Sequence, residues 1–223
     1  MARSKNPRGH LWLLISLLVI FTISPFVVPY YYGPVILDVI AASVLVSATY
    51  AVSGRRSFFI LATALSTIAI SFTFWLAAAP SRWLMIVSHG SLVIVISYFA
   101  VAILSYVLGG GRVTADKIYG AICAYLLFGY AFTFLYSVIE EVQPGSFTSL
   151  ASVAPPDIVG RVMQTRYFSF VSLTSVGYGD IVPHSQMART MALVEAMLGQ
   201  FYLVALIGRL VGLHIVHGAE PRK

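Results

Sequence analysis

Residues 172–183 read SLTSVGYGDIVP, a run of small polar residues and glycines in a chain that is otherwise mostly apolar. In an ordinary strand, successive carbonyls point to opposite sides. Aiming them all one way requires left-handed backbone angles at alternate residues, which glycine adopts without a steric cost. Gly177 and Gly179 occupy alternate positions. The carbonyl oxygens of Ser175 through Tyr178 are therefore predicted to form a ladder, and four such ladders around an axis would replace the hydration shell of a cation.

The composition indicates a lipid-embedded protein. The chain has 223 residues, of which 59% are hydrophobic and only 10% charged, whereas soluble domains have about 25% charged residues. The net charge of +6 comes from basic residues in short loops and tails, so we interpret it as a topology signal facing anionic lipid headgroups and expect no nucleic-acid partner. The single cysteine, Cys123, excludes an internal disulfide framework and a CxxC metal pair, and no cofactor is expected besides the conducted ion.

Six apolar stretches are long enough to cross a bilayer as helices of about 20 residues. They cover residues 11–28, 34–52, 58–79, 83–108, 118–139 and 186–213. The first is too long for a signal-peptide core and lacks a small-residue cleavage site, so it is predicted to be retained. The expected fold is an all-α membrane protein with six transmembrane helices.

The basic residues predict the orientation. Ten of the fourteen Lys and Arg fall in the N-terminal segment, two turns and the C-terminal tail, which share one side of the membrane. That side is expected to be cytoplasmic, with both termini inside. These residues are Arg3, Lys5, Arg8, Arg55, Arg56, Arg112, Lys117, Arg209, Arg222 and Lys223. A small multi-pass chain of this kind suits a bacterial inner (plasma) membrane.

The segment 140–185 does not fit a further spanning helix. It begins as a polar loop containing Pro and Gly, and residues 161–174 follow as a helix-compatible stretch well short of a full span, which is typical of a re-entrant helix. Irregular backbone at membrane depth is tolerated only where it is buried in protein or lines a water-filled path. A polar solute is therefore expected to pass here, and the C-terminal end of the half-helix would direct its partial negative charge toward that path.

The TSVGYGD stretch resembles the selectivity filter of the tetrameric potassium channels, and the half-helix and flanking spans lie where that family has them. It consists of Thr174, Ser175, Val176, Gly177, Tyr178, Gly179 and Asp180. The resemblance covers roughly residues 111–216. It implies that dehydrated K+ binds the Ser175 hydroxyl and the filter carbonyls from Ser175, Val176, Gly177 and Tyr178, that the Tyr178 ring packs against the half-helix, and that the assembly is a homotetramer. Such a protein is not an enzyme; it conducts K+ passively.

Three departures from the family pattern stand near the filter. The family usually has threonine where Ser175 stands, so the innermost site keeps its hydroxyl but loses a methyl group. Tyr167 and Phe168 replace a frequent tryptophan pair, and Tyr167 is predicted to donate a hydrogen bond to Asp180. Val171 stands where some members have a glutamate that pairs with this aspartate. The departures leave open a weakly selective cation channel as an alternative.

The last span contains further candidate site residues. Gly199 matches the position of the family's gating hinge, although close helix packing explains a glycine there equally well. Glu195, an intramembrane acid, needs a partner, and hydroxyls of the half-helix such as Ser172 or Thr174 are candidates; ion coordination is the other interpretation of this acid. Helical spacing predicts a pore-lining stripe. It comprises Ala196, Gln200, Leu203, Ile207 and Val211.

The chain is expected to divide into a four-helix transmembrane domain (1–110) and a pore domain (111–223). The fourth span has no Arg or Lys, so it cannot sense voltage by moving charges across the membrane. Little sequence follows the last span, so no cytosolic ligand-binding domain is expected. His184, just beyond the filter, is a candidate pH-sensitive group because histidine titrates near pH 6.5.

Two further alternatives come from other classes. A K+ transporter subunit carries four degenerate filters with one key glycine each, whereas this chain has one filter with both glycines. A membrane receptor or scaffold would leave the loop without a conducting role, and nothing in the sequence favours it.

Overall fold

The computed structural model describes residues 9–28, 30, 33–51, 56–79, 81–109, 114–148 and 158–218. In these ranges the regular secondary structure is helical apart from one two-stranded antiparallel pair, which confirms the all-α prediction. The helices are α1 (Gly9–Val27), α2 (Gly33–Ala51), α3 (Arg56–Ala78), α4 (Arg82–Leu108), α5 (Ala115–Val142), α6 (Ile158–Leu173) and α7 (Gln186–Gly218), and the strands are β1 (Phe147–Thr148) and β2 (Val182–Pro183).

Five of these helices contain stretches that are long and apolar enough to span a bilayer, namely α1, α3, α4, α5 and α7. In α2 the apolar stretch among the described residues, Val39–Tyr50, is shorter. A helix nevertheless lies at each of the six predicted spans, and the short re-entrant helix is α6. The protein is thus an all-α membrane protein, while the number of six spanning helices stays a prediction.

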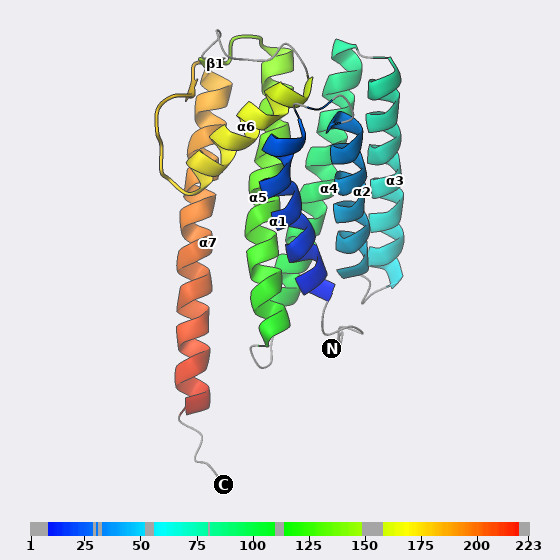
Figure 1. Ribbon diagram of the computed structural model, residues 1–223. Coiled ribbons are helices and arrows are strands. Elements are labelled where there is room, and N and C mark those ends of the chain that lie inside the picture. Colours follow the sequence, from blue (N-terminus) through cyan, green and yellow to red (C-terminus); the bar gives the residue numbers. More distant parts are fainter. Residues whose placement is uncertain are drawn as a thin grey trace.

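Several charges used to predict the orientation lie outside the described residues. They are Arg3, Lys5, Arg8, Arg55, Arg112, Arg222 and Lys223. The described structure shows that α1 begins and α7 ends toward the same end of the helix bundle (Figure 1). This end is opposite to the one that carries the β1–β2 pair.

Polar caps and turns set the helix ends. The side chains of Ser81 and Thr114 accept hydrogen bonds from the backbone N–H groups of Leu84 and Lys117, which satisfies free donors in the first turns of α4 and α5. At the other end of α5 the chain turns through Gly145, whose φ of 83° lies in the left-handed region. The boundary signals are therefore local and readable in the sequence.

Helix α5 is the centre of the fold (Figure 1). On one side it packs against α4 and α1, and on the other against α6 and α7. In its most apolar stretch 61% of the residues are buried, compared with 11% for α7. Helix α7 is joined to the rest mainly through α6 and α5 and stands at the edge of the molecule, so most of its side chains face outward in a single chain.

The first four helices enclose, together with α5, an apolar cavity of about 160 Å³. Leu45 and Ala48 of α2, Phe99 of α4 and Leu127 of α5 are among its walls, and every residue that lines it is uncharged. The core around this cavity is therefore largely apolar and incompletely filled.

Candidate ion-conduction site

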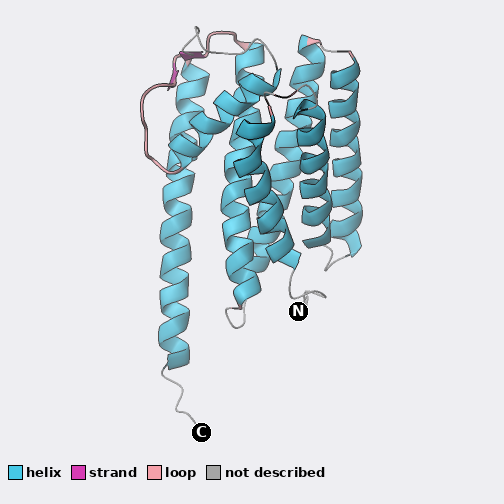
Figure 2. Cartoon of the chain, viewed as in Figure 1, coloured by secondary structure: helices cyan, strands magenta, loops and turns pink. Residues whose placement is uncertain are grey.

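Helix α6 holds the filter by its C-terminal end. The last carbonyls of a helix lack partners within the helix, and here the filter backbone supplies them. The N–H of Ser175 donates to the carbonyl of Ser172 (2.9 Å), and the N–H groups of Val176 and Gly177 both donate to the carbonyl of Val171 (3.0 and 3.4 Å). The filter therefore begins as a continuation of α6 and then runs back along α7 as a loop (Figure 2).

Left-handed angles alternate along the filter. The φ angle is 57° at Ser175, 61° at Gly177 and 81° at Gly179, whereas Val176 and Tyr178 between them have negative φ. Both predicted glycines thus adopt the left-handed conformation. The alternation starts two residues before the first of them, at Ser175. Residues of alternating hand can present successive carbonyls to one side, which is the arrangement a dehydrated cation needs.

Tyr178 and Asp180 both lie against Tyr167 of α6. The two tyrosine rings are stacked, with centroids 6.3 Å apart and planes 5° from parallel. A hydrogen bond from the Tyr167 hydroxyl to the Asp180 carboxylate raises the pKa of Tyr167 to about 12 and lowers the pKa of Asp180 below its ordinary value. The N–H of Ile181 donates to the same carboxylate (3.0 Å). The outer end of the filter is thereby tied to α6 through one aromatic residue.

Phe168 points the other way, into an aromatic cluster behind α6. Its ring is 5.1 Å from those of Tyr136 and Phe147, and these two rings are 5.4 Å apart, all in edge-to-face geometry. Phe168 is buried, whereas Tyr167 is exposed in a single chain. The two residues predicted to replace a tryptophan pair therefore differ in role: one faces the filter and the other anchors α6 to α5 and β1.

Glu195 of α7 is fully buried and accepts two hydrogen bonds. The hydroxyls of Tyr136 on α5 and Ser169 on α6 both lie 2.5 Å from its carboxylate. Ser169 also lies 2.7 Å from the Gly129 carbonyl of α5. The carboxylate thus joins three helices, and we propose that it braces the filter support rather than coordinates an ion.

A hydroxyl of the half-helix does bond to Glu195, as predicted, but it is that of Ser169 and not that of Ser172 or Thr174. Thr174 donates its hydroxyl to the carbonyl of Phe170 (2.6 Å), one turn back in the same chain segment. Ser169 lies one helical turn before Ser172, and that turn is the one facing α7. A sequence pattern locates the half-helix but does not fix its rotation, and the partner on α5 has no local signal at all.

Gly199 lies where α7 crosses the end of α6. A Cβ atom at this position would sit 2.1 Å from the carbonyl oxygen of Leu173. The Tyr125 hydroxyl of α5 donates to the same oxygen (3.3 Å). Close packing therefore requires glycine here, and α7 continues as a helix through this residue. A hinge role for Gly199 stays a prediction.

The predicted pore-lining stripe is described only in its outer half. Gln200 is exposed, and its side-chain Nε2 donates to the Ser175 hydroxyl oxygen (3.0 Å). Leu203 is also exposed, and Ala196 is half-buried. The side chains of Ile207 and Val211 lie outside the described residues, so an inner gate at these positions stays a prediction.

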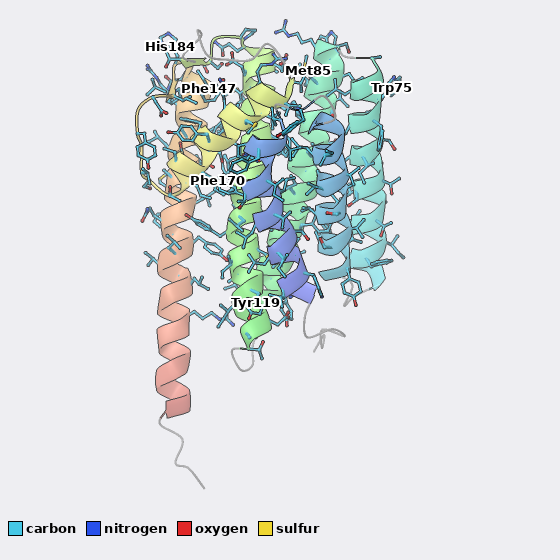
Figure 3. The ribbon with its side chains drawn as sticks, in the orientation of Figure 1. Trp75, Met85, Tyr119, Phe147, Phe170 and His184 are labelled. Atoms are coloured by element: carbon cyan, nitrogen blue, oxygen red, sulfur yellow. The ribbon has the colours of Figure 1, made fainter. Side chains whose placement is uncertain are left out.

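His184 is exposed beyond the filter, at the end of the bundle that also holds Trp75 and Met85 (Figure 3). Its backbone N–H donates to the carbonyl of Ser146 (2.6 Å), next to the β1–β2 pair. The position agrees with an outer mouth, and a pH-sensing role stays a prediction.

The other end of α7 is tied to the first four helices. The guanidinium of Arg209 donates to the carbonyls of Leu108 (2.7 Å) and Gly109 (2.8 Å), and the ammonium of Lys117 donates to the latter as well (3.0 Å). Cations at a helix C-terminus are favourable because that end is partially negative. The sequence identified these two basic residues only as topology signals. The structural role of Arg209 depends on contacts with residues about 100 positions earlier, whereas Lys117 contacts a carbonyl eight residues before it.

Comparison with known proteins agrees with this geometry. Residues 122–213, which run from α5 through the filter to α7, match the sequence model of a family described as "Ion channel". This segment is similar to that ion channel family. This match supports the predicted resemblance to the tetrameric potassium channel family. Together with the apolar helices, it indicates that the protein is an integral, multi-pass membrane protein.

Two curated relatives cover a similar length. Protein LctB of Bacillus caldotenax and Protein LctB of Geobacillus stearothermophilus are each 27% identical over 100 residues, which is 45% of this chain and 74% of the relative. No solved structure is significantly similar to the chain.

Proposed function

We propose that this protein is a potassium-selective channel that conducts K+ passively, with a filter formed by residues 174–180 of four identical chains. The observation that carries the proposal is the alternation of left-handed angles at Ser175, Gly177 and Gly179. Ser175 adopts this conformation although left-handed angles are uncommon for residues other than glycine. A conformation that is costly at one residue and repeated at alternate positions is explained by the need to aim the carbonyls at an ion.

Exposure supports the homotetramer. Residues 174–180 are exposed in a single chain, yet dehydrating a cation requires a closed ring of oxygen ligands. The outward surface of α7 is also strongly apolar. Its exposed apolar residues include Leu193, Met197, Leu198, Phe201 and Val204. Four copies arranged around the filter would bury part of this surface and leave lipid on the rest.

We propose a division into residues 1–110 and residues 111–223, with both termini in the cytoplasm and the filter toward the outside of a bacterial inner membrane. Support comes from the position of α6, which lies at the end of the bundle opposite the start of α1 and the end of α7 (Figure 1). Because α4 carries no Lys or Arg after Arg82, the channel is not voltage-gated by moving charges.

A weakly selective cation channel is the second candidate, because Ser175 lacks the threonine methyl group and Tyr167 stands in place of a larger tryptophan. A transporter subunit is less well supported, since the filter keeps both glycines. Competition between K+ and Na+ distinguishes the first two.

The test is K+ flux into proteoliposomes of the purified protein, with Na+ as competitor and Ba2+ as blocker. Gly177→Ala forces a side chain into a left-handed position, and Gly145→Ala does the same outside the filter, each in open space. We expect wild-type flux that prefers K+ and is blocked by Ba2+, loss of the preference in Gly177→Ala, and retention in Gly145→Ala. Equal Na+ and K+ flux in the wild type would instead support the weakly selective channel.

A further inference from the structure

The backbone at the innermost filter site explains why a serine stands there. Ser175 has a φ of 57°, and this left-handed region is a genuine outlier for β-branched residues such as threonine. Serine is the hydroxyl-bearing residue with the smaller steric conflict. In this chain, the departure from the family's threonine is therefore compatible with the conformation that the filter adopts.

Serine brings a problem that threonine does not have. The side chain of threonine is stiff about χ1 because two heavy atoms branch from Cβ. The serine hydroxyl can rotate among three staggered positions, and only some of them direct an oxygen lone pair toward an ion on the axis. Without a second restraint, the site would lose part of its preorganisation.

Gln200 supplies a restraint of the required kind. Its Nε2 lies 3.0 Å from the Ser175 oxygen and donates to it. A serine oxygen has two lone pairs, so one remains available for a cation. The position of Gln200 is well determined, because the preceding residue, Gly199, packs directly against the Leu173 carbonyl at the end of α6.

We propose that Gln200 is a positioning residue for the innermost cation site: its amide orients the Ser175 hydroxyl and thereby sets the K+ affinity of that site. The proposal rests on the proposed function, since the site binds K+ only if the filter does. It also links α7 to the filter, because a movement of the helix at Gln200 changes the orientation of a filter ligand.

The experiment measures K+ affinity independently of any gate. The melting temperature of the purified protein is followed as K+ replaces Na+ at constant ionic strength, because a bound ion stabilises the folded state according to its affinity. Wild type, Gln200→Leu, Ser175→Ala and the double variant form a cycle. Gln186→Leu, the same change at an exposed position at the start of α7, is the matched control.

We expect Gln200→Leu to raise the K+ concentration for half-maximal stabilisation by about three- to tenfold, which corresponds to the loss of one hydrogen bond. Ser175→Ala should produce a shift at least as large, and the double variant should shift no further than Ser175→Ala. The melting temperature in K+-free buffer should change little in Gln200→Leu, because Gln200 is exposed and water can replace its hydrogen bond to Ser175 when no ion is bound. Gln200→Asn keeps the amide but is one methylene shorter, so it should resemble Gln200→Leu.

The outcomes separate the two proposals. If wild type is stabilised equally by K+ and Na+, a potassium-selective site is absent and both proposals fail. If wild type prefers K+ but the shifts of the single variants add in the double variant, or Gln200→Leu and Gln200→Asn bind K+ as wild type does, only the role of Gln200 is overturned. A fall in K+-free melting temperature without a change in K+ affinity would assign Gln200 a merely structural role.

Discussion

The two halves of this protein hold their buried polar groups in different ways. Around the filter, helices α5, α6 and α7 are joined by polar contacts between elements, such as those of Glu195 with Tyr136 and Ser169. In the first four helices, the buried hydroxyl of Thr49 bonds to a carbonyl of its own helix, at Leu45. The hydroxyl contacts that run between these helices, Ser16 with Ser47 and Thr73 with Ser88, are longer, at 3.3 and 3.4 Å. The space between those helices is an apolar cavity. Interhelical polar bonds specify one arrangement, whereas apolar surfaces fit together in several ways.

The difference indicates where precise geometry is needed. A filter that replaces water around an ion tolerates little displacement of its ligands, and its supporting helices are accordingly fixed by directional bonds and by backbone contact at Gly199. Among the residues that the structure describes, helices α1 to α4 make no hydrogen bond to residues 174–180, and their link to the inner end of α7 passes through Arg209. Substitutions in the two halves should therefore have unequal effects.

The largest effect is expected from Gly199→Ala. The added methyl would overlap the Leu173 carbonyl, which belongs to the backbone and cannot move without displacing the filter. We expect a loss of stability of about 3 kcal/mol or more and no K+ flux. Gly208→Ala is the control on the same helix, since a Cβ there meets nothing within 4 Å. Thermal unfolding and flux measure both, and a functional, stable Gly199→Ala protein would contradict the packing described here.

Glu195→Leu should be the next most harmful change. It leaves the buried Tyr136 hydroxyl without its acceptor, whereas the Ser169 hydroxyl keeps the Gly129 carbonyl, and an unsatisfied buried group costs about 1–3 kcal/mol. Thr49→Val removes a buried hydroxyl from the first four helices that donates to the Leu45 carbonyl of its own helix, and should change stability by less than about 1 kcal/mol. Equal losses in the two variants, measured by thermal unfolding, would remove the contrast between the halves.

A smaller effect of opposite sign is expected in the cavity. Ala48→Leu adds apolar atoms to a space of about 160 Å³, and filling a cavity commonly stabilises a protein by about 0.5–2 kcal/mol. The K+ to Na+ preference should be unchanged. Destabilisation of this variant would mean that the space is already filled or cannot accommodate the added side chain.

The smallest effect is expected from Tyr167→Phe, and it depends on pH. The pKa of Asp180 is lowered by the Tyr167 hydroxyl, so this contact stabilises the filter above the ordinary pKa of aspartate and the contribution is lost as the pH falls through the lowered pKa. The pKa of Tyr167 is raised to about 12, so the hydroxyl keeps its proton, and the bond, until the pH rises through that value.

Removing the hydroxyl should return the Asp180 pKa toward its ordinary value. K+ flux of Tyr167→Phe should therefore begin to fall at a higher pH than that of wild type when the external solution is acidified. His184→Ala in the same titration separates the candidate outer-mouth histidine from this pair. If K+ flux falls at the same acidic pH in wild type and in Tyr167→Phe, the contact between Tyr167 and Asp180 does not support the filter.

The sequence predicted the filter region better than its surroundings. Alternating glycines, a half-helix and apolar spans are local patterns, and each one has its counterpart in the structure at α6, residues 174–180 and the long helices. The left-handed angle at Ser175 was not predicted, because a serine gives no local signal for it. The short β1–β2 pair was also missed, because it joins residues about 35 positions apart and so leaves no local pattern in the sequence.

The contacts between helices were the least predictable part. Gln200 was placed on the pore-lining stripe by helical spacing, but its bond to Ser175 depends on how closely α7 approaches α6, which Gly199 determines. The partners of Glu195 depend on the rotation of two helices about their axes. Such contacts depend on how whole helices pack against one another, and this packing is determined by many residues along the chain and not by a local sequence pattern.

The central claim is that the filter binds K+ in preference to Na+. The most direct measurement is the reversal potential of the purified protein in a planar bilayer with KCl on one side and NaCl on the other. We predict a reversal potential displaced far from zero, with the KCl side negative because K+ leaves it in preference to Na+ entering, and with current blocked by Ba2+. A reversal potential near zero, with equal Na+ and K+ currents, would contradict the claim.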